Sequence, residues 1–109
     1  MDRTEAARKF AEVVGWTLQG YAYGDRWYFY NPLGEDADLP ATDAPLHEHL
    51  AFVGRVAEAV RDVPLESVMF FRGQPSPWYA KFYGVRAELA PDLSHAALLA
   101  GIAAKEASR

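Results

Sequence analysis

Cysteine is absent from this 109-residue chain. Disulfide bonds, thiolate metal sites and cysteine nucleophiles are therefore excluded. Long hydrophobic runs are absent too, since no segment approaches the roughly 18 apolar residues of a membrane-spanning helix. The first residues, MDRTEAARKF, contain no apolar segment of the kind that secretory signals carry. We therefore expect a cytoplasmic protein that has no membrane partner.

Basic charge is scarce as well. Lysine and arginine number 11 against 15 aspartates and glutamates, which gives a formal net charge of −4. Proteins that bind the nucleic-acid backbone present a basic face, so nucleic acid is not expected as a direct ligand. The sequence also lacks the GxGxxG, P-loop and GxSxG motifs of dinucleotide sites, phosphate-binding loops and serine nucleophiles. We predict no cofactor, and no motif supports an enzyme.

What the chain does contain is apolar and aromatic. Half of its residues are hydrophobic and 14% are aromatic. A chain of this length has room for one core, so we predict a single domain over residues 1–109. The tyrosines and tryptophans are suited either to that core or to an interface, because each combines a large apolar ring with a polar tip.

Two segments have the apolar spacing of amphipathic helices. Asp2 and Glu5 form a capping pair before a helix over residues 3–14, and Gly15 stands where a terminal glycine would end it. A second helix is predicted over residues 44–62, and we expect its apolar stripe to pack on a sheet. That stripe comprises Leu46, Leu50, Val53, Ala57 and Val60, and it is widened by Phe52, Val56 and Val63.

A third helix is predicted from about residue 93 to Ala107. The segment before it offers Asp92 and Ser94 as alternative N-cap residues. Its many alanines keep the helix thin, which allows close packing against its neighbours.

Alternating or β-rich segments predict the strands. Residues 16–23 and 26–30 read as a hairpin that turns at a Gly-Asp pair. The acidic, proline-bearing segment 31–43 has no period and is predicted to be a loop. Residues 67–72 form a mostly apolar strand, which we place at the centre of the sheet. Two further alternating segments cover residues 78–83 and 85–89.

The predicted fold is α+β, with the order α-β-β-α-β-β(-β)-α. We expect one antiparallel sheet of four or five strands with three helices. Two β-β-α passages follow one another along the chain. Aligning Leu46 with Leu93 places Gly54 on Gly101, so internal duplication and chance similarity of two helices both stay open.

The histidines do not have the spacing of a metal site. His47 and His49 stand two positions apart and so face opposite sides of a helix, whereas zinc-binding helices use positions i and i+4. We predict that His49 is a partly buried structural residue. His95 lies in the first turn of the last helix, where the helix dipole disfavours a charged ring. The acids of the 31–43 segment do not match a calcium-binding loop, so no metal is predicted.

The remaining candidates for function are polar-tipped aromatics and the segments that the core does not explain. The rings are either core residues or a contact surface, and the arginine and glutamine nearby are typical of interfaces. The candidate binding residues are Tyr23, Tyr28, Tyr30, Glu35, Asp36, Asp38, Arg72, Gln74 and Trp78.

The C-terminal passage W-Y-A-K-F…A-x-L-A-P-D-L-S-H-A-A-L-L-A, together with the Asn31-Pro32 element, resembles the phage ABA sandwich domain family. The resemblance covers about residues 27–105. It implies a helix-sheet-helix sandwich and a phage or prophage origin. It implies no activity, because that family carries no catalytic residues that could be transferred to this chain.

We therefore expect a non-enzymatic phage accessory protein that binds and inhibits a host protein, such as a defence component, in the bacterial cytosol. One alternative is a small-ligand binder that holds a nucleotide-like signal between aromatic rings and Arg72 or Arg86. Whether the chain forms a homodimer is left open. Another is a small hydrolase that uses His95 or His47.

Overall fold

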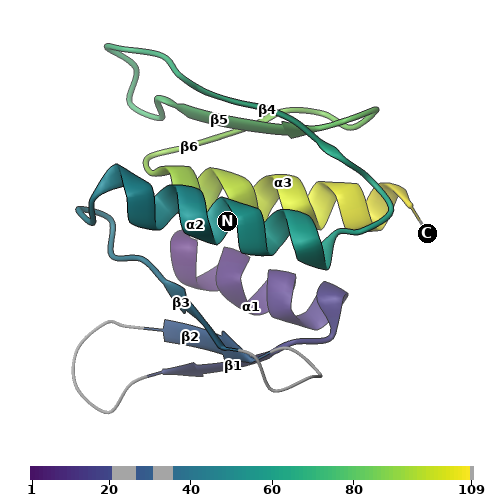
Figure 1. Cartoon of the computed structure of the whole chain (residues 1–109). Helices are drawn as coiled ribbons and strands as arrows, with labels where there is room; N and C mark the ends of the chain where they lie inside the picture. The colour runs from purple at the N-terminus through teal and green to yellow at the C-terminus, as the bar shows by residue number, and fades with distance from the viewer. Residues whose placement is uncertain (21–26, 31–35, 109) are drawn as a thin grey trace.

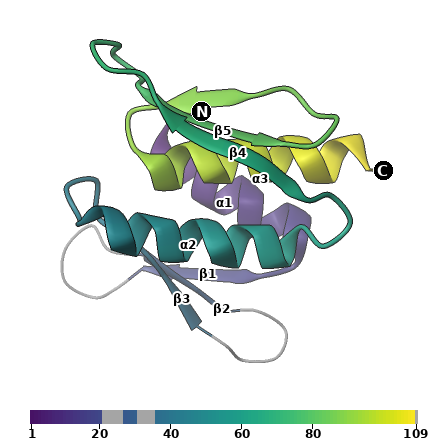
Figure 2. The ribbon, with the colours of Figure 1, turned by 45° about the horizontal axis from the view of Figure 1, so that its top comes forward.

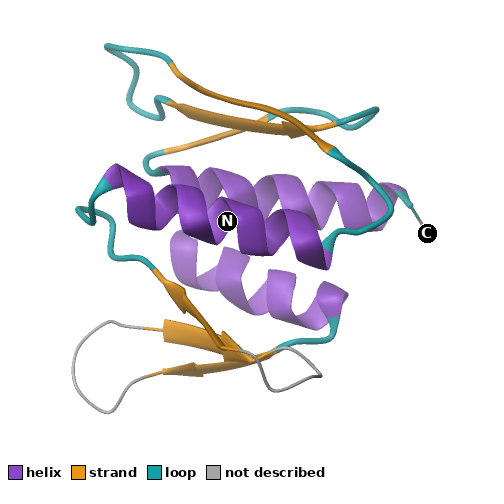
Figure 3. Cartoon of the chain, in the orientation of Figure 1, coloured by secondary structure: helices purple, strands orange, loops and turns teal. Residues whose placement is uncertain are grey.

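The computed structural model describes residues 1–20, 27–30 and 36–108. A layer of helices lies between two antiparallel sheets (Figures 1 and 3). The helices are α1 (Arg3–Val14), α2 (Leu46–Ala59) and α3 (Leu93–Ala107). One sheet contains β1 (Thr17–Gly20), β2 (Trp27–Tyr30) and β3 (Asp36–Leu39), and the other contains β4 (Leu65–Phe70), β5 (Trp78–Phe82) and β6 (Glu88–Ala90).

The α+β class and the three helices are confirmed, but the single sheet of four or five strands is not. The observed order of layers is sheet, helices, sheet (Figure 2), and not the helix-sheet-helix order that the family resemblance implied. The burial pattern explains this order. Helix α3 is buried on nearly all sides, as expected for a helix that is apolar all round. Each sheet has only one well-buried face and therefore needs cover on one side.

Helix α1 begins and ends at the capping residues that the sequence predicted, Asp2 and Gly15. The Asp2 carboxylate accepts a hydrogen bond of 2.8 Å from the backbone N–H of Glu5, and this bond lowers the pKa of Asp2 below its ordinary value. Gly15 adopts a left-handed backbone with φ of 76° and donates its N–H to the Ala11 carbonyl. A residue with a side chain would be strained in that conformation.

Helix α2 is shorter than predicted, and its expected apolar face is confirmed in part. Phe52, Val53, Val56 and Val60 are buried together with His49, whereas Leu46 and Leu50 are exposed. The helix packs mainly against α3 and makes a smaller contact with β3, although it was expected to pack on a sheet.

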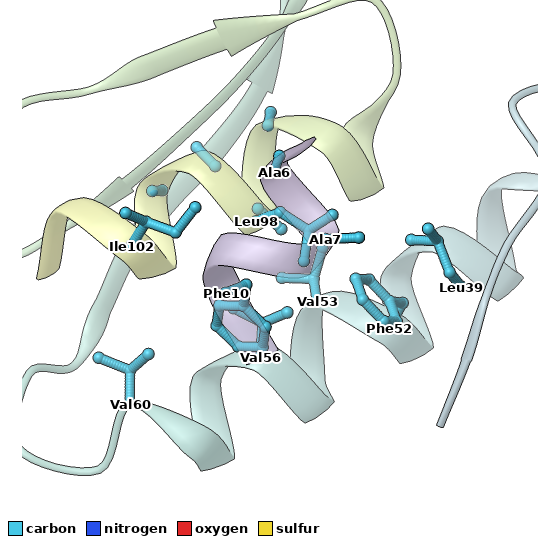
Figure 4. Packing of buried hydrophobic residues seen from close by; sticks show 14 of the residues in the cluster. Ala6, Ala7, Phe10, Leu39, Phe52, Val53, Val56, Val60, Leu98 and Ile102 are labelled. Atoms are coloured by element: carbon cyan, nitrogen blue, oxygen red, sulfur yellow. The ribbon is translucent and has the colours of Figure 1, made fainter. Parts of the chain in front are cut away.

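Helix α3 is confirmed, and Asp92 is the residue that caps it. The Asp92 carboxylate accepts a hydrogen bond of 2.9 Å from the backbone N–H of His95. The small residues of the helix allow its neighbours to approach closely. A Cβ atom added to Gly101 would lie only 2.8 Å from the ring of Phe10 in α1. Figure 4 shows Phe10, Val56, Leu98 and Ile102 among the buried residues of the core that the three helices share.

The segment predicted as a loop over residues 31–43 contains strand β3. Its sequence, DADL, places Asp36 and Asp38 on the exposed face and Ala37 and Leu39 on the buried face. Four residues with two acids resemble a solvated loop in composition, which is why the strand was missed. The predicted hairpin is confirmed as the β1–β2 pair, with Leu18 opposite Phe29. Its Gly-Asp turn lies outside the described residues.

The strand placed at the centre of the sheet lies at an edge instead. Among the described strands, β4 pairs with β5 alone, and β5 is the central strand between β4 and β6. The apolar composition of β4 suggested burial on both faces, but Met69 and Phe70 are both exposed. Ala80 and Phe82 of β5 supply the buried face of this sheet.

After α1, the chain passes twice through three strands and a helix. Both sheets are antiparallel meanders, and each is followed directly by a helix, α2 or α3. The expected repeat of strand-and-helix passages is therefore present in the order of the elements. The first passage has one more strand than was predicted, and the second contains the third strand that the predicted order left open.

Candidate functional site

A buried polar cluster joins the N-terminal parts of the helices. Asp92 lies 2.9 Å from Arg3 Nε in an ion pair, and Arg3 also donates to the Pro40 carbonyl. The imidazole Nδ1 of His49 lies 2.7 Å from Ser94 Oγ and 3.9 Å from Asp92 Oδ1. This cluster connects α1, α2, α3 and the end of β3.

A serine, a histidine and an aspartate in contact invite comparison with a catalytic triad. In a triad the serine and the aspartate contact opposite nitrogens of the ring, whereas here Ser94 and Asp92 both lie on the Nδ1 side of His49. The Ser94 side chain is 0% exposed, so no substrate reaches it. The geometry is that of a satisfied buried network, and it agrees with the structural role predicted for His49.

The other two histidines do not form an acid–base pair with a carboxylate side chain in the interactions that the described residues make. His47 is exposed on α2. His95 is buried, and its Nε2 lies 3.1 Å from the Met1 carbonyl. It lines a hollow of about 590 Å³ together with Glu88 and Glu106. Within residues 1–20, 27–30 and 36–108, no group of histidines and carboxylates has the arrangement of a metal site.

The outer face of the first sheet brings four of the candidate binding residues together. Tyr28 stands opposite Asp38, and Tyr30 stands opposite Asp36, in the β2–β3 register. The two tyrosine rings lie 4.8 Å apart in an edge-to-face arrangement. The Tyr30 hydroxyl donates its single hydrogen to Gln19 Oε1 and accepts a hydrogen bond from the Tyr28 hydroxyl. This face is polar. Tyr23 and Glu35 were predicted to belong to the same surface and lie outside the described residues.

The outer face of the second sheet is apolar. Tyr79 of β5 stands opposite Met69 on one side and opposite Leu89 on the other. Phe71 follows β4, and its ring centroid lies 5.8 Å from that of Tyr79. We call these four residues the apolar outer face. The exposed fractions of Met69, Phe71 and Leu89 are 43%, 43% and 52%, which is large for apolar side chains.

The turn between β4 and β5 adds a rim to this face. A hollow of about 520 Å³ is lined by Phe71, Tyr79 and Leu89 and by Gln74, Pro75 and Ser76 of the turn. Gln74 therefore lies where it was expected, beside the aromatic rings. Arg72 is exposed in the same turn.

Trp78 does not join the apolar outer face. It lies on the opposite face of β5 from Tyr79, the face that also carries the buried Ala80 and Phe82. Its ring packs at 4.8 Å from that of Phe70. Half-buried against the core, Trp78 is closer to a packing residue than to the contact residue that was predicted.

Charge is found only beside this face and not in its centre. Lys81 forms an ion pair with Glu66, and the hydrogen bond that its ammonium donates to the Glu66 carboxylate raises the pKa of Lys81 above its ordinary value. Arg86 Nε lies 2.7 Å from Glu88 Oε1. Each of these charges is already paired. The apolar outer face thus has the arrangement of an interface, in which charge is depleted at the centre and placed at the rim.

Gln74 was among the candidate residues named from the sequence, whereas Met69, Phe71 and Leu89 were not. The signal available was the apolar run VMFF, which was assigned to a buried strand.

No family model, curated protein or solved structure matches this chain. In the described parts of the chain, no helix is long and apolar enough to cross a membrane.

Proposed function

We propose that this protein acts by binding another protein through the apolar outer face of β4, β5 and β6. The observation that carries the proposal is the row of Met69, Tyr79 and Leu89 across three paired strands, flanked by Phe71. Contiguous exposed apolar patches of this kind mark sites of interaction on soluble proteins. Aromatic residues and methionine are also the types that interfaces enrich.

The chemistry of the hollow favours a protein over a charged small ligand. None of its described lining residues is charged, whereas a nucleotide-like signal carries phosphates that need cationic or N–H donors. Two arginines were considered as such donors: Arg86 is paired with Glu88, and Arg72 is not among the residues that line the hollow. An apolar side chain from a partner protein suits this hollow better.

The buried cluster around His49 gives no support to a hydrolase. Its serine is inaccessible and its ring contacts are all on one nitrogen. We therefore retain binding as the proposed mode of action and do not assign a reaction to His47 or His95.

The partner that we propose is a bacterial host protein, with inhibition of a defence component as the effect. This part of the proposal rests on the resemblance of the C-terminal passage to the phage ABA sandwich domain family. The structure supports the binding surface, and the resemblance supports the kind of cell in which a partner is to be sought.

The test compares wild-type protein with a variant of the surface and a matched control. Leu89→Asp places a charge in the apolar outer face. Leu50→Asp places the same charge on α2, where Leu50 is 46% exposed and lies outside that face. Proteins captured from bacterial lysate are identified by mass spectrometry, purified, and titrated against all three forms.

We expect Leu89→Asp to weaken binding of the purified partner by about tenfold or more, as burying an unpaired charge at an interface centre does. Leu50→Asp should bind like wild type. Equal binding by all three forms would show that the partner uses another surface, and failure of any purified protein to bind wild type would refute the proposed function.

A further inference from the structure

We infer that two copies of this chain pair through the free edges of their β4 strands, antiparallel and about a two-fold axis. The three-stranded sheets of the two copies then form one continuous sheet. The proposal concerns the edge of β4 and a second copy, so it does not depend on the partner protein proposed above.

The edge of β4 differs from the other sheet edges. In the part of the chain that the structure describes, strand β4 has six residues, LESVMF, whereas β1 and β3 have four each and β6 has three. Proteins protect sheet edges by keeping them short or by placing charges and prolines on them. Strand β3 carries Asp36 and Asp38, and β6 is short and followed by Pro91. The C-terminal half of β4 has none of these protections.

The exposed side chains of β4 lie on both faces of the strand. Met69 is 43% exposed on the outer face, and its neighbour Phe70 is 54% exposed on the face that Trp78 shares. Phe71, again on the outer face, is also exposed. A partner that lay on the outer face would leave Phe70 uncovered. A strand added to the edge flanks both faces, because its own side chains alternate in the same way.

The register with β5 determines which backbone groups of β4 face the free edge. Phe71 donates its N–H to the Pro77 carbonyl, and Met69 stands opposite Tyr79. In an antiparallel ladder the hydrogen-bonded pairs alternate, so Met69 and Phe71 direct their backbone groups toward β5. Val68 and Phe70 direct theirs toward the free edge.

These groups define a register for the pair of copies. If Val68 of one copy exchanges hydrogen bonds with Phe70 of the other, Met69 meets Met69 at the two-fold axis. The same register brings Glu66, which lies at the bulge of β4 and is paired with Lys81, near Arg72 of the turn that follows β4 in the second copy. The charges at the two ends are therefore opposite in sign, which favours this arrangement, since like charges directly opposite one another destabilise a strand pair. Arg72 thereby gains a role that the core does not give it.

The joined sheets also bring two apolar outer faces together. Phe71 stands beside Ser67 of the second copy in this register, and Met69 and Tyr79 extend the apolar surface on either side of the axis. A heterologous partner would still find this surface accessible, because edge pairing leaves the outer face uncovered.

Cysteine cross-linking tests the register directly, because the chain has no cysteine of its own. Opposed residues that are not hydrogen bonded have Cα atoms about 4.5 Å apart, which is within the roughly 4.4–6.8 Å that a disulfide spans. Met69→Cys should therefore give a disulfide-linked dimer under mild oxidation, as seen on a non-reducing gel.

Two variants serve as controls. Ser67→Cys lies on the same strand, but the two sulfurs would be separated by about four residues along the ladder, or about 13 Å, and should not be linked. Leu89→Cys is as exposed as Met69→Cys but lies on β6, away from the β4 edge. Rapid linking of Met69→Cys alone supports the proposed register.

The wild-type chain should show a mass of twice 12.1 kDa by light scattering at micromolar concentration. Met69→Lys, which places two ammonium groups at the axis, should return it to 12.1 kDa while its circular dichroism stays unchanged. A monomeric wild type, or linking of Leu89→Cys as fast as Met69→Cys, would overturn the proposal. Leu89→Asp should leave the dimer intact, so a failure of the dimer and a failure of partner binding are distinguishable.

Discussion

Asp92 is the residue on which most of the buried polar interactions converge. Its carboxylate caps α3 through the His95 N–H at 2.9 Å, pairs with Arg3 Nε at 2.9 Å, and lies 3.9 Å from His49 Nδ1. Buried charges are tolerated when they are paired and hydrogen bonded. Removing Asp92 therefore leaves a helix end uncapped and Arg3 unpaired at once.

We expect Asp92→Ala to lower the free energy of unfolding by about 2 kcal/mol, because it combines the loss of a cap with the loss of the ion pair of the half-buried Arg3. Asp92→Asn keeps an oxygen that can cap the helix and should lose less. Urea denaturation followed by circular dichroism measures both.

Asp2→Ala is the matched control, since Asp2 makes the same type of cap on α1 at an exposed position. Its loss of stability should be smaller than that of Asp92→Ala. Equal losses for the two alanine variants would mean that the pairing of Asp92 with Arg3 adds nothing to the cap.

At the scale of elements, α2 and α3 occupy equivalent places after their sheets but have different surroundings. Gly54 and Gly101 correspond when the two helices are aligned from Leu46 and Leu93. No atom lies within 4 Å of a Cβ added to Gly54, whereas a Cβ added to Gly101 meets Phe10 at 2.8 Å and Val56 at 3.0 Å. Phe10 is held by edge-to-face contacts with Trp16 and Phe29, so its ring has little room to move.

Alanine at these two positions should have opposite effects. Gly54→Ala should raise the free energy of unfolding by about 0.5–1 kcal/mol, because alanine favours a helix more than glycine does. Gly101→Ala should lower it by about 1–3 kcal/mol, as overpacking of a buried contact does. Thermal and urea unfolding of both variants provide the measurement, and a stabilising Gly101→Ala would contradict the close packing of α1 on α3.

At the scale of the whole molecule, α3 connects the two sheets. It packs against β5 and β6 on one side and against α1 and α2 on the other, and these two helices contact the first sheet. Phe29 of β2 meets Phe10 and Phe52 within the same core. The two β-β-β-α passages therefore share one hydrophobic core, although each has its own sheet.

We expect the two sheets to unfold together. Trp16 directly precedes β1, Trp27 is the first residue of β2, and Trp78 is the first residue of β5. The variant Trp78→Phe therefore keeps only the tryptophans of the first sheet as fluorescence reporters, and the double variant Trp16→Phe/Trp27→Phe keeps only that of the second sheet. The two fluorescence transitions should coincide with that of circular dichroism, as in two-state unfolding. Separate midpoints would show that the passages are independent units.

Much of the local structure was predictable from the sequence because its causes are local. The caps at Asp2, Gly15 and Asp92 depend on residues within one helical turn, and the alternation in residues 78–83 reports one buried face of one strand. Strand β3 was missed because its two acids suit a solvated loop as well as the exposed face of a strand.

The arrangement of layers and the candidate surface were decided by tertiary structure. The helix layer lies between the sheets because α3 must be covered on nearly all sides while each sheet needs cover on one. Met69, Tyr79 and Leu89 come from three strands, so only the register of the sheet makes them neighbours. The sequence determined by itself where α1 begins and ends, because its caps at Asp2 and Gly15 act within a turn. The apolar outer face exists only once distant segments pair.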